Sequence, residues 1–220
     1  MNRAFIFDMD GTLIDSERAW QLLEKPMLER VLGQDTALRL GSTVGLNASQ
    51  IFERVQKIDP SPSFEDIMES YAGIDLSAVY ESSQITPGAD ELINSLDSKG
   101  YKIGLVTQSS QQCVELVLKR LSYAAKIERA LSLFQHPQLN PKPSPDGYIE
   151  ILREFSAEPK RSFILEDSNA GIQSGKSAGA FVIGFTGNLL DGYEQTGADI
   201  YAETMSEVID IIRRPHKDSI

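Results

Sequence analysis

Residues 5–12 of this 220-residue chain read FIFDMDGT, in which an apolar run ends abruptly at two carboxylates, Asp8 and Asp10. The run is too short for a helix and lacks polar alternation, so it predicts a strand buried on both faces. Two neighbouring carboxylates at its end repel each other and lose water, which is costly. A turn or a helix cap would explain such a pair. The alternative is a bound hard cation such as Mg²⁺, and hence a metal-assisted reaction on an oxyanion.

Three further short apolar runs indicate that the sheet continues along the chain. They lie at Ile103 to Val106, Phe163 to Leu165 and Phe181 to Phe185. Helical patterns occupy Ala89 to Lys99, Gln111 to Leu121, Pro145 to Phe155 and Ser168 to Ala178. Alternating strands and helices are typical of a parallel sheet covered on both faces. We therefore expect an α/β fold, a doubly wound parallel sheet with a Rossmann-like core.

Residues 15–84 interrupt this alternation. The pattern there is helical throughout, with candidate helices at 15–32, 48–57, 64–72 and 75–83, and no strand is expected. The segment Pro60-Ser61-Pro62 predicts a turn between two of them. A helical block between the first strand and the rest of the sheet indicates an inserted all-helical cap domain. We expect a core of residues 1–14 and 85–220 and a cap of residues 15–84.

The composition limits the classes of partner. A net charge of -11 disfavours nucleic acid and anionic membrane surfaces as partners, although a small phosphorylated metabolite needs only local positive charge. Cys113 is the single cysteine, which excludes an intrachain disulfide and favours a reducing cytoplasm. No apolar run approaches the roughly 18 residues that span a bilayer, and Asp8 comes too early for a signal peptide. We expect a cytoplasmic monomer.

Polar residues follow three of the predicted strands at their carboxyl ends. Asp8 follows the first, Thr107 follows Ile103 to Val106, and Glu166 and Asp167 follow Phe163 to Leu165. In a doubly wound sheet the ligand crevice forms outside these strand ends. Residues far apart in the sequence should therefore meet at one edge of the sheet.

The first of these segments has the groups for phosphoryl transfer through a covalent intermediate. Asp8 is the candidate nucleophile, which splits a difficult displacement into two steps. Asp10 is the candidate acid/base, facing the same way as Asp8 if the strand extends to it. Gly11 and Thr12 suit a tight turn whose backbone N–H groups point toward phosphate oxygens.

The remaining groups would bind the phosphate and the cation. The Thr107 hydroxyl and the backbone N–H groups of Gln108 and Ser109 are candidate phosphate donors, although Thr107 alone would also suit a helix N-cap. Lys142, between two prolines, is a candidate phosphate-binding cation, with a solvated turn lysine as the alternative. Glu166 and Asp167 would complete a Mg²⁺ site with Asp8 and the main-chain oxygen of Asp10. Their alternative is stabilisation of a helix dipole.

Four ordered motifs resemble those of the haloacid dehalogenase superfamily. They are FIFDMDGTLIDS at 5–16, VTQSS at 106–110, KPSPD at 142–146 and LEDSNAGI at 165–172. The likeness extends over the whole chain and favours the phosphatase and β-phosphoglucomutase-like branch with a helical cap. It implies Mg²⁺ as the cofactor and the following roles: nucleophile, Asp8; acid/base, Asp10; phosphate contacts, Thr107 and Lys142; metal ligands, Asp8, Asp10 and Asp167 with Glu166 close by. Gln108 departs from the Asn or Ser of many members.

The resemblance assigns substrate choice to the cap, whose loop is expected at residues 40–47, with Ser42 and Gly45 as specificity residues. A β-phosphoglucomutase-like enzyme should carry an arginine where this chain has Ser42. The expectation is therefore hydrolysis of a small phosphomonoester, a sugar or polyol phosphate, with the mutase as the alternative. A receiver-like switch also uses a phosphorylated Asp, a Thr and a Lys, but it is about half this length and lacks a helical insertion.

Overall fold

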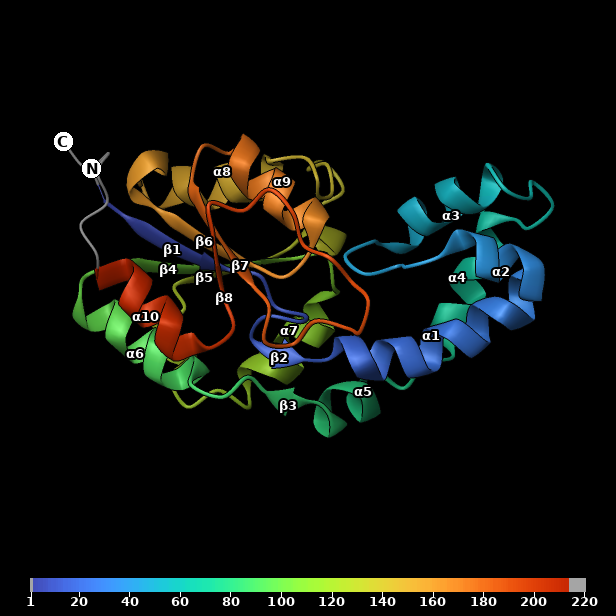
Figure 1. Cartoon of the computed structure of the whole chain (residues 1–220), viewed down its shortest axis with the longest axis horizontal. Helices are drawn as coiled ribbons and strands as arrows, with labels where there is room; N and C mark the ends of the chain where they lie inside the picture. The colour runs from blue at the N-terminus through green and yellow to red at the C-terminus, as the bar shows by residue number, and fades with distance from the viewer. Residues whose placement is uncertain (1, 214–220) are drawn as a thin grey trace.

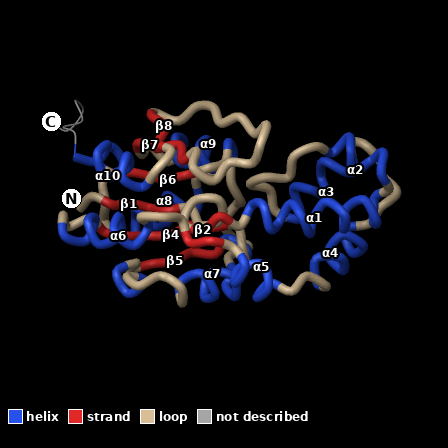
Figure 2. The backbone as a smooth tube through the Cα atoms, turned by 60° about the horizontal axis from the view of Figure 1, so that its bottom comes forward, coloured by secondary structure: helices blue, strands red, loops and turns tan. Residues whose placement is uncertain are grey.

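The computed structural model describes residues 2–213, in which six parallel strands form one sheet. The order across the sheet is β5-β4-β1-β6-β7-β8, which places β1 in the interior of the sheet (Figures 1 and 2). The strands are β1 (Ala4–Phe7), β4 (Lys102–Thr107), β5 (Arg129–Ser132), β6 (Phe163–Glu166), β7 (Phe181–Phe185) and β8 (Ile200–Ala202). The predicted doubly wound parallel fold is confirmed.

Helices cover both faces of this sheet, as strand pleating requires. Phe5 and Phe7 of β1 point to one face and join the apolar side chains of α6 (Ala89–Ser98), α7 (Gln111–Leu118) and α10 (Met205–Arg213). Ala4 and Ile6 point to the other face and join α8 (Asp146–Glu154) and α9 (Asn169–Ser177). Because successive residues of a strand face opposite ways, one fully apolar strand serves two layers. Figure 1 shows α8 and α9 on the side of the sheet opposite α6 and α10.

The helical insertion has an apolar cluster of its own. The insertion comprises helices α1 (Glu17–Leu32), α2 (Gln34–Leu40), α3 (Ala48–Gln56), α4 (Phe64–Ala72) and α5 (Leu76–Ser82). The cluster consists of Met27, Leu28, Leu32, Leu40, Ile51, Val55 and Ile67. Helices α1 to α4 lie at one end of the molecule, beyond the carboxyl ends of the strands (Figure 1). The separate cluster supports the proposed division into a core (1–14 and 85–220) and a cap (15–84).

Two short strands join the core and the cap. Strand β2 (Ile14–Asp15) pairs antiparallel with β3 (Gln84–Ile85), so the outgoing and returning chain lie side by side. The expectation of no strand between 15 and 84 is wrong at these two ends, because two residues carry no readable periodicity. Sequence patterns also missed α2, α10, β5, β8 and three single turns of 3-10 helix, at Ala124–Lys126, Leu133–Gln135 and Pro159–Arg161. Within residues 2–213, none of the helices has the length and apolar character that a membrane span requires.

Candidate active site

Asp8 lies at the tip of β1 and is paired with a buried lysine. The backbone N–H of Asp8 donates to the Leu165 carbonyl at 2.9 Å, which ties the tip of β1 to β6. Lys142 Nζ donates to Asp8 Oδ1 at 2.5 Å, to Glu166 Oε1 at 2.6 Å and to the Val106 carbonyl at 3.1 Å. The lysine is only 2% exposed. Three strand ends thus share one ammonium group, that of the lysine that the sequence analysis singles out as a phosphate-binding candidate.

The acidic groups around Lys142 outnumber it. Oxygens of Asp8, Glu166 and Asp167 lie within 4.8 Å of one another, and all three residues are buried. Burial, reinforced by the neighbouring carboxylates, raises the pKa of Asp8 and of Asp167 well above the usual range. Burial alone would lower the pKa of Lys142, but the charges of Asp8 and Glu166 outweigh it and raise that pKa. Three carboxylates beside one ammonium fit a divalent cation, which would balance the charge with oxygen ligands.

The Glu166 carboxylate is already saturated by protein donors. Its Oε1 accepts from Lys142 and from the Tyr148 hydroxyl, both at 2.6 Å, and its Oε2 accepts from the Ser168 hydroxyl at 3.1 Å. Glu166 is fully buried, and a Cβ on Gly171 would lie only 1.8 Å from its Oε1. The glycine therefore makes room for this carboxylate. The geometry favours Glu166 as the group that positions Lys142, while Asp8 and Asp167 face the cavity.

Asp10 is held by a turn and three hydroxyls rather than by the strand. Strand β1 ends at Phe7, and the Gly11 and Thr12 N–H groups donate to the carbonyls of Ile14 and Met9 within the turn. The expectations that strand pleating aims Asp10 and that these two N–H groups face phosphate are therefore wrong. The Asp10 carboxylate accepts from the hydroxyls of Ser16 (2.6 Å), Tyr80 (2.9 Å) and Ser109 (2.6 Å). It lies outside the acidic group at Asp8.

The Thr107 side chain faces the same site. Thr107 ends β4, is 1% exposed, and its hydroxyl lies 3.5 Å from Asp10 Oδ2. The hydroxyl oxygen accepts from the backbone N–H of Ser109 at 3.0 Å. Helix α7 begins instead at Ser110, whose side chain accepts from the Cys113 N–H. Thr107 is therefore not the N-cap of that helix, which removes the main alternative to a ligand contact.

Gln108 connects the core to the cap loop. Its Nε2 donates to the Gly45 carbonyl at 2.5 Å, and its Oε1 accepts from Asn47 Nδ2 at 3.3 Å. The cap thus engages both polar ends of a side chain that was expected at the phosphate. Asn47 also starts α3, where it forms a reciprocal capping box with Gln50. The Gln50 side chain donates to the Lys142 carbonyl, so this helix start contacts two of the phosphate-binding candidates.

The two predicted specificity residues lie on this loop in different environments. Gly45 has a φ of +71°, and a Cβ there would lie 2.7 Å from Ser168 Cβ, so only glycine allows this approach to the core. Ser42 is exposed, and Arg54 donates to its backbone carbonyl at 3.1 Å. Both residues line the same cavity as Asp8.

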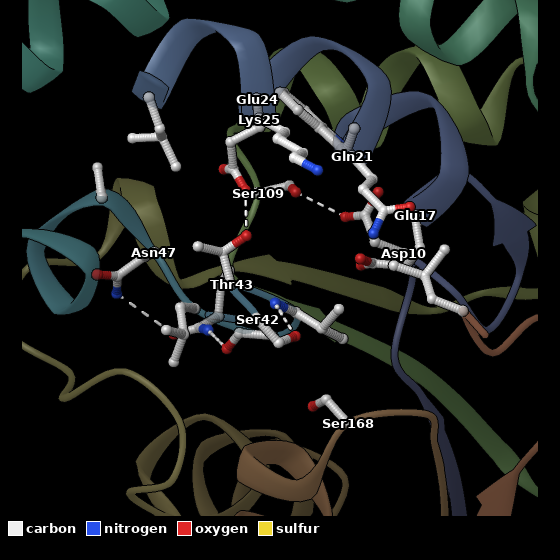
Figure 3. Close-up of a pocket in the computed structure, with 18 of the residues that line it drawn as sticks. Asp10, Glu17, Gln21, Glu24, Lys25, Ser42, Thr43, Asn47, Ser109 and Ser168 are labelled. Carbon is white, nitrogen blue, oxygen red and sulfur yellow. Dashed lines mark hydrogen bonds between the residues drawn. The ribbon is translucent and has the colours of Figure 1, made fainter. Parts of the chain in front are cut away.

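That cavity, of about 830 Å³, lies between the strand ends and the cap. The core side contributes Asp8, Asp10, Thr107, Lys142 and Asp167. The cap side contributes polar side chains of α1, α4 and the 41–47 loop, including Glu17, Gln21, Glu24, Lys25, Thr43 and Tyr71. Figure 3 shows Glu24, Lys25 and Gln21 of α1 facing the same space as Asp10 and Ser109. The size is within the usual range for small-molecule sites.

Sequence reasoning missed several residues that shape this site. Ser16 before α1, Tyr80 of α5 and Ser109 donate hydrogen bonds to Asp10. Tyr148 of α8 donates one to Glu166. Glu17 adds a further carboxylate, and burial followed by the charge of Asp10 raises its pKa to about 8. Serine and tyrosine are common throughout a chain, so no local sequence pattern distinguishes the hydroxyls that bind these two carboxylates from other hydroxyls.

Comparisons with known proteins agree with this geometry. The family described as haloacid dehalogenase-like hydrolase matches residues 5–185. Hexitol phosphatase B of Escherichia coli K12 is 30% identical over 179 residues, covering 80% of this chain and 79% of that protein. Mitochondrial (DL)-glycerol-3-phosphatase 1 of Arabidopsis thaliana is 26% identical over 193 residues, covering 84% of this chain. The match spans 64% of that relative's length, somewhat less than two thirds.

Solved structures share the fold. A haloacid dehalogenase-like protein of Agrobacterium tumefaciens superposes with a TM-score of 0.72 at 22% identity, covering 97% of this chain and 98% of that one. A predicted phosphoglycolate phosphatase of Haemophilus somnus gives a TM-score of 0.71 at 21% identity, covering 96% of this chain and 97% of that one. Core and cap are included in both likenesses, since nearly the whole chain is covered.

Proposed function

The chain belongs to the haloacid dehalogenase-like hydrolase family, and within it we propose a Mg²⁺-dependent phosphatase that hydrolyses a small sugar or polyol phosphate. The observation that carries the proposal is the pairing of buried Asp8 with Lys142 at the strand ends, opening on a cavity whose other wall is formed by the cap. The phosphatases among its relatives support the reaction class.

In the first step, an Asp8 carboxylate oxygen attacks phosphorus while the ester P–O bond breaks. Asp10 gives its proton to the departing oxygen, which leaves as the free alcohol. Lys142 and Thr107 stabilise the transferring phosphoryl group through its oxygens. The backbone N–H of Gln108 adds a donor, while its side chain stays with the cap loop.

In the second step, Asp10 takes a proton from water, and the water oxygen attacks phosphorus. The Asp8–phosphorus bond breaks, inorganic phosphate leaves, and both carboxylates return to their starting state. The hydroxyls of Ser16, Tyr80 and Ser109 hold Asp10 in one orientation through both proton transfers.

Asp8 and Asp167, with the main-chain oxygen of Asp10 and with Glu166 behind them, would hold the Mg²⁺. The ion would supply charge neutralisation, without which anionic Asp8 would be repelled by its substrate. The chemistry of the donor set fits, since buried carboxylate oxygens suit a hard cation.

The surroundings of the site complete the proposal. Ser42 and Gly45 contribute to substrate choice through the cap loop. The partner is a small phosphorylated metabolite, and the net charge of -11 makes nucleic acid and membrane unfavourable partners. We also propose that the protein acts as a monomer in the cytoplasm, where a single unpaired cysteine stays reduced.

Phosphate release tests the proposal directly. Wild-type protein should release inorganic phosphate from p-nitrophenyl phosphate over many turnovers with Mg²⁺, and EDTA should stop it. Asp8→Asn should lower kcat by at least about 10⁴-fold with an unchanged circular dichroism spectrum. Asp35→Asn, at an exposed position of α2, is the matched control and should keep wild-type activity. Full activity of Asp8→Asn would exclude the covalent route.

The same assay separates the two alternatives. One phosphate per chain without turnover would indicate a receiver-like switch. A β-phosphoglucomutase-like enzyme would convert a sugar 1-phosphate to its 6-phosphate in the presence of a bisphosphate. Ser42→Arg tests the basis for preferring hydrolysis, and an unchanged balance of the two activities would remove that basis.

A further inference from the structure

The cap wall of the cavity contains one carboxylate fixed by two hydroxyls. Glu24 of α1 accepts a hydrogen bond on Oε1 from the Tyr71 hydroxyl of α4. Its Oε2 accepts one from the Thr43 hydroxyl of the cap loop. All three side chains line the cavity that contains Asp8, and Figure 3 shows the Thr43–Glu24 bond facing it. Because Glu24 of α1 is held by side chains from both α4 and the cap loop, its carboxylate is preorganised for binding.

The bonding pattern leaves acceptors facing the cavity. Burial, followed by the charge of Glu24, raises the pKa of the Tyr71 hydroxyl, so this hydroxyl keeps its proton and donates it to Glu24. The Thr43 proton is used in the same way. Each Glu24 oxygen keeps a free lone pair, and the two hydroxyl oxygens can accept but not donate further. A ligand at this place must therefore bring its own donors.

The charge of this wall favours an uncharged ligand. Glu24 and Glu29 of α1 line the cavity, against a single lysine of the same helix, Lys25. A carboxylate or a second phosphate on the substrate would face this excess of negative charge and would bring no proton for Glu24. Hydroxyl groups have neither disadvantage, because they donate a proton and carry no charge.

We propose that Glu24 selects the substrate, by accepting hydrogen bonds from hydroxyl groups at the end of the molecule away from the phosphate. The preferred substrates are then polyol or sugar monophosphates with an uncharged, hydroxylated end, and esters with an anionic end are rejected. This inference rests on the proposed phosphatase function and deepens it to a substrate class and a residue.

The wild-type protein provides the first measurement. With Mg²⁺, kcat/KM for sorbitol 6-phosphate or glycerol 3-phosphate should exceed that for 2-phosphoglycolate by at least about tenfold. Equal values, or a preference for phosphoglycolate, would overturn the inference while leaving the phosphatase function in place. If p-nitrophenyl phosphate and all three esters fail to react, it is the phosphatase function that fails.

The variant Glu24→Gln provides the second measurement. It preserves size and keeps one acceptor oxygen, and kcat/KM for the polyol phosphates should fall about tenfold through loss of the charged acceptor. Hydrolysis of p-nitrophenyl phosphate should fall less than hydrolysis of the polyol phosphates, because its leaving group has no hydroxyl to bind at Glu24. The preference over 2-phosphoglycolate should shrink accordingly. An unchanged preference would show that Glu24 only holds the loop.

Glu69→Gln is the matched control. Glu69 lies on α4 close to Tyr71 in the sequence, is exposed, and is not part of the cavity lining. The same change of charge at this position should leave all four rates within about twofold of wild type. If it reproduced the Glu24→Gln pattern, net cap charge rather than a hydrogen bond to Glu24 would control selectivity, and the proposal would be wrong.

Discussion

On the core side of the cavity the charged groups are buried and tied to strand ends, whereas on the cap side they are less buried and Glu24 is held by hydroxyls of the cap itself. Lys142 bridges Asp8 and Glu166 at 2% exposure. Glu24 is only partly buried and bonds to Tyr71 and Thr43, both of the cap. The core holds charges where the sheet places them, which suits a fixed reaction. The cap can change its hydroxyls and carboxylates without disturbing that sheet, which suits substrate selection.

The largest expected effect is at the centre of the core side. Lys142→Met removes the only cation that contacts Asp8 within residues 2–213, and kcat should fall about 10²–10³-fold because the transferring phosphoryl group loses a charged donor. Steady-state phosphate release measures it. The exposed Lys160→Met is the control and should behave as wild type. A loss seen only in KM would mean that the core binds substrate without stabilising its transition state.

A pair of tyrosines sharpens the comparison. Tyr80→Phe removes one of the hydroxyl donors to Asp10 and should lower kcat about tenfold with little change in KM. Tyr71→Phe removes a donor from Glu24 and should raise KM for polyol phosphates with little change in kcat. Kinetics on one polyol phosphate give both values. The same pattern in both variants would contradict a division of labour between the groups around Asp10 and the groups around Glu24.

The core charges should also cost stability. Asp167 is 3% exposed among other carboxylates, and burial followed by the charges of Asp8 and Glu17 raises its pKa. In EDTA at pH 7.5, Asp167→Asn should therefore raise Tm by roughly 2–4 °C, a gain of about 1 kcal/mol. Mg²⁺ should raise Tm of the wild type more than that of the variant. The exposed Asp210→Asn should change neither the Tm in EDTA nor the rise in Tm caused by Mg²⁺. A lower Tm for Asp167→Asn would show that this buried carboxylate does not destabilise the metal-free protein.

The last expected effect is a pH dependence of stability at the boundary of the two regions. Burial, followed by the charge of Asp10, raises the pKa of Glu17 from 4.5 to about 8, so the folded state keeps a proton that the unfolded state has lost. This contribution to stability is complete below pH 4.5 and is lost as pH rises through 8. Glu17→Gln should therefore show a shallower fall of stability with pH, by at most about 1.4 kcal/mol per unit. Urea unfolding in EDTA from pH 5 to 9 measures the free energy of unfolding of both proteins. Parallel pH dependences for wild type and Glu17→Gln would exclude Glu17 as the source of the fall in stability.

Much of the core could be predicted because its signals are local. Short, fully apolar runs identified β1, β4, β6 and β7, since a strand buried on both faces leaves no place for polar residues. The end strand β8 escaped detection because it has three residues, of which only Ala202 is buried. Helix α2 escaped for a related reason, with seven residues and only two buried positions.

The candidate site divides in the same way. Asp8, Thr107, Glu166 and Asp167 could be named in advance, because the carboxyl ends of parallel strands meet at one edge of the sheet. Lys142 could be named from the two prolines that flank it. The partners of Asp10 could not, since Tyr80 is 70 residues away in the sequence and its hydroxyl resembles any other on a helix. The contact of Gln108 with the Gly45 carbonyl of the cap loop could not be predicted either, because the two residues are 63 positions apart.

By itself, the sequence determined a parallel sheet, a helical insertion and the chemical identity of the groups at three strand ends, because hydrophobic pattern and strand polarity are properties of neighbouring residues. Only the tertiary structure decided that Glu166 holds Lys142 and that the hydroxyls of Ser16, Tyr80 and Ser109 orient Asp10. It also decided that Glu24 lines the cavity while accepting hydrogen bonds from Tyr71 and Thr43. The physical reason is that hydrogen bonds between distant elements depend on how helices and loops pack, and sequence spacing does not record it.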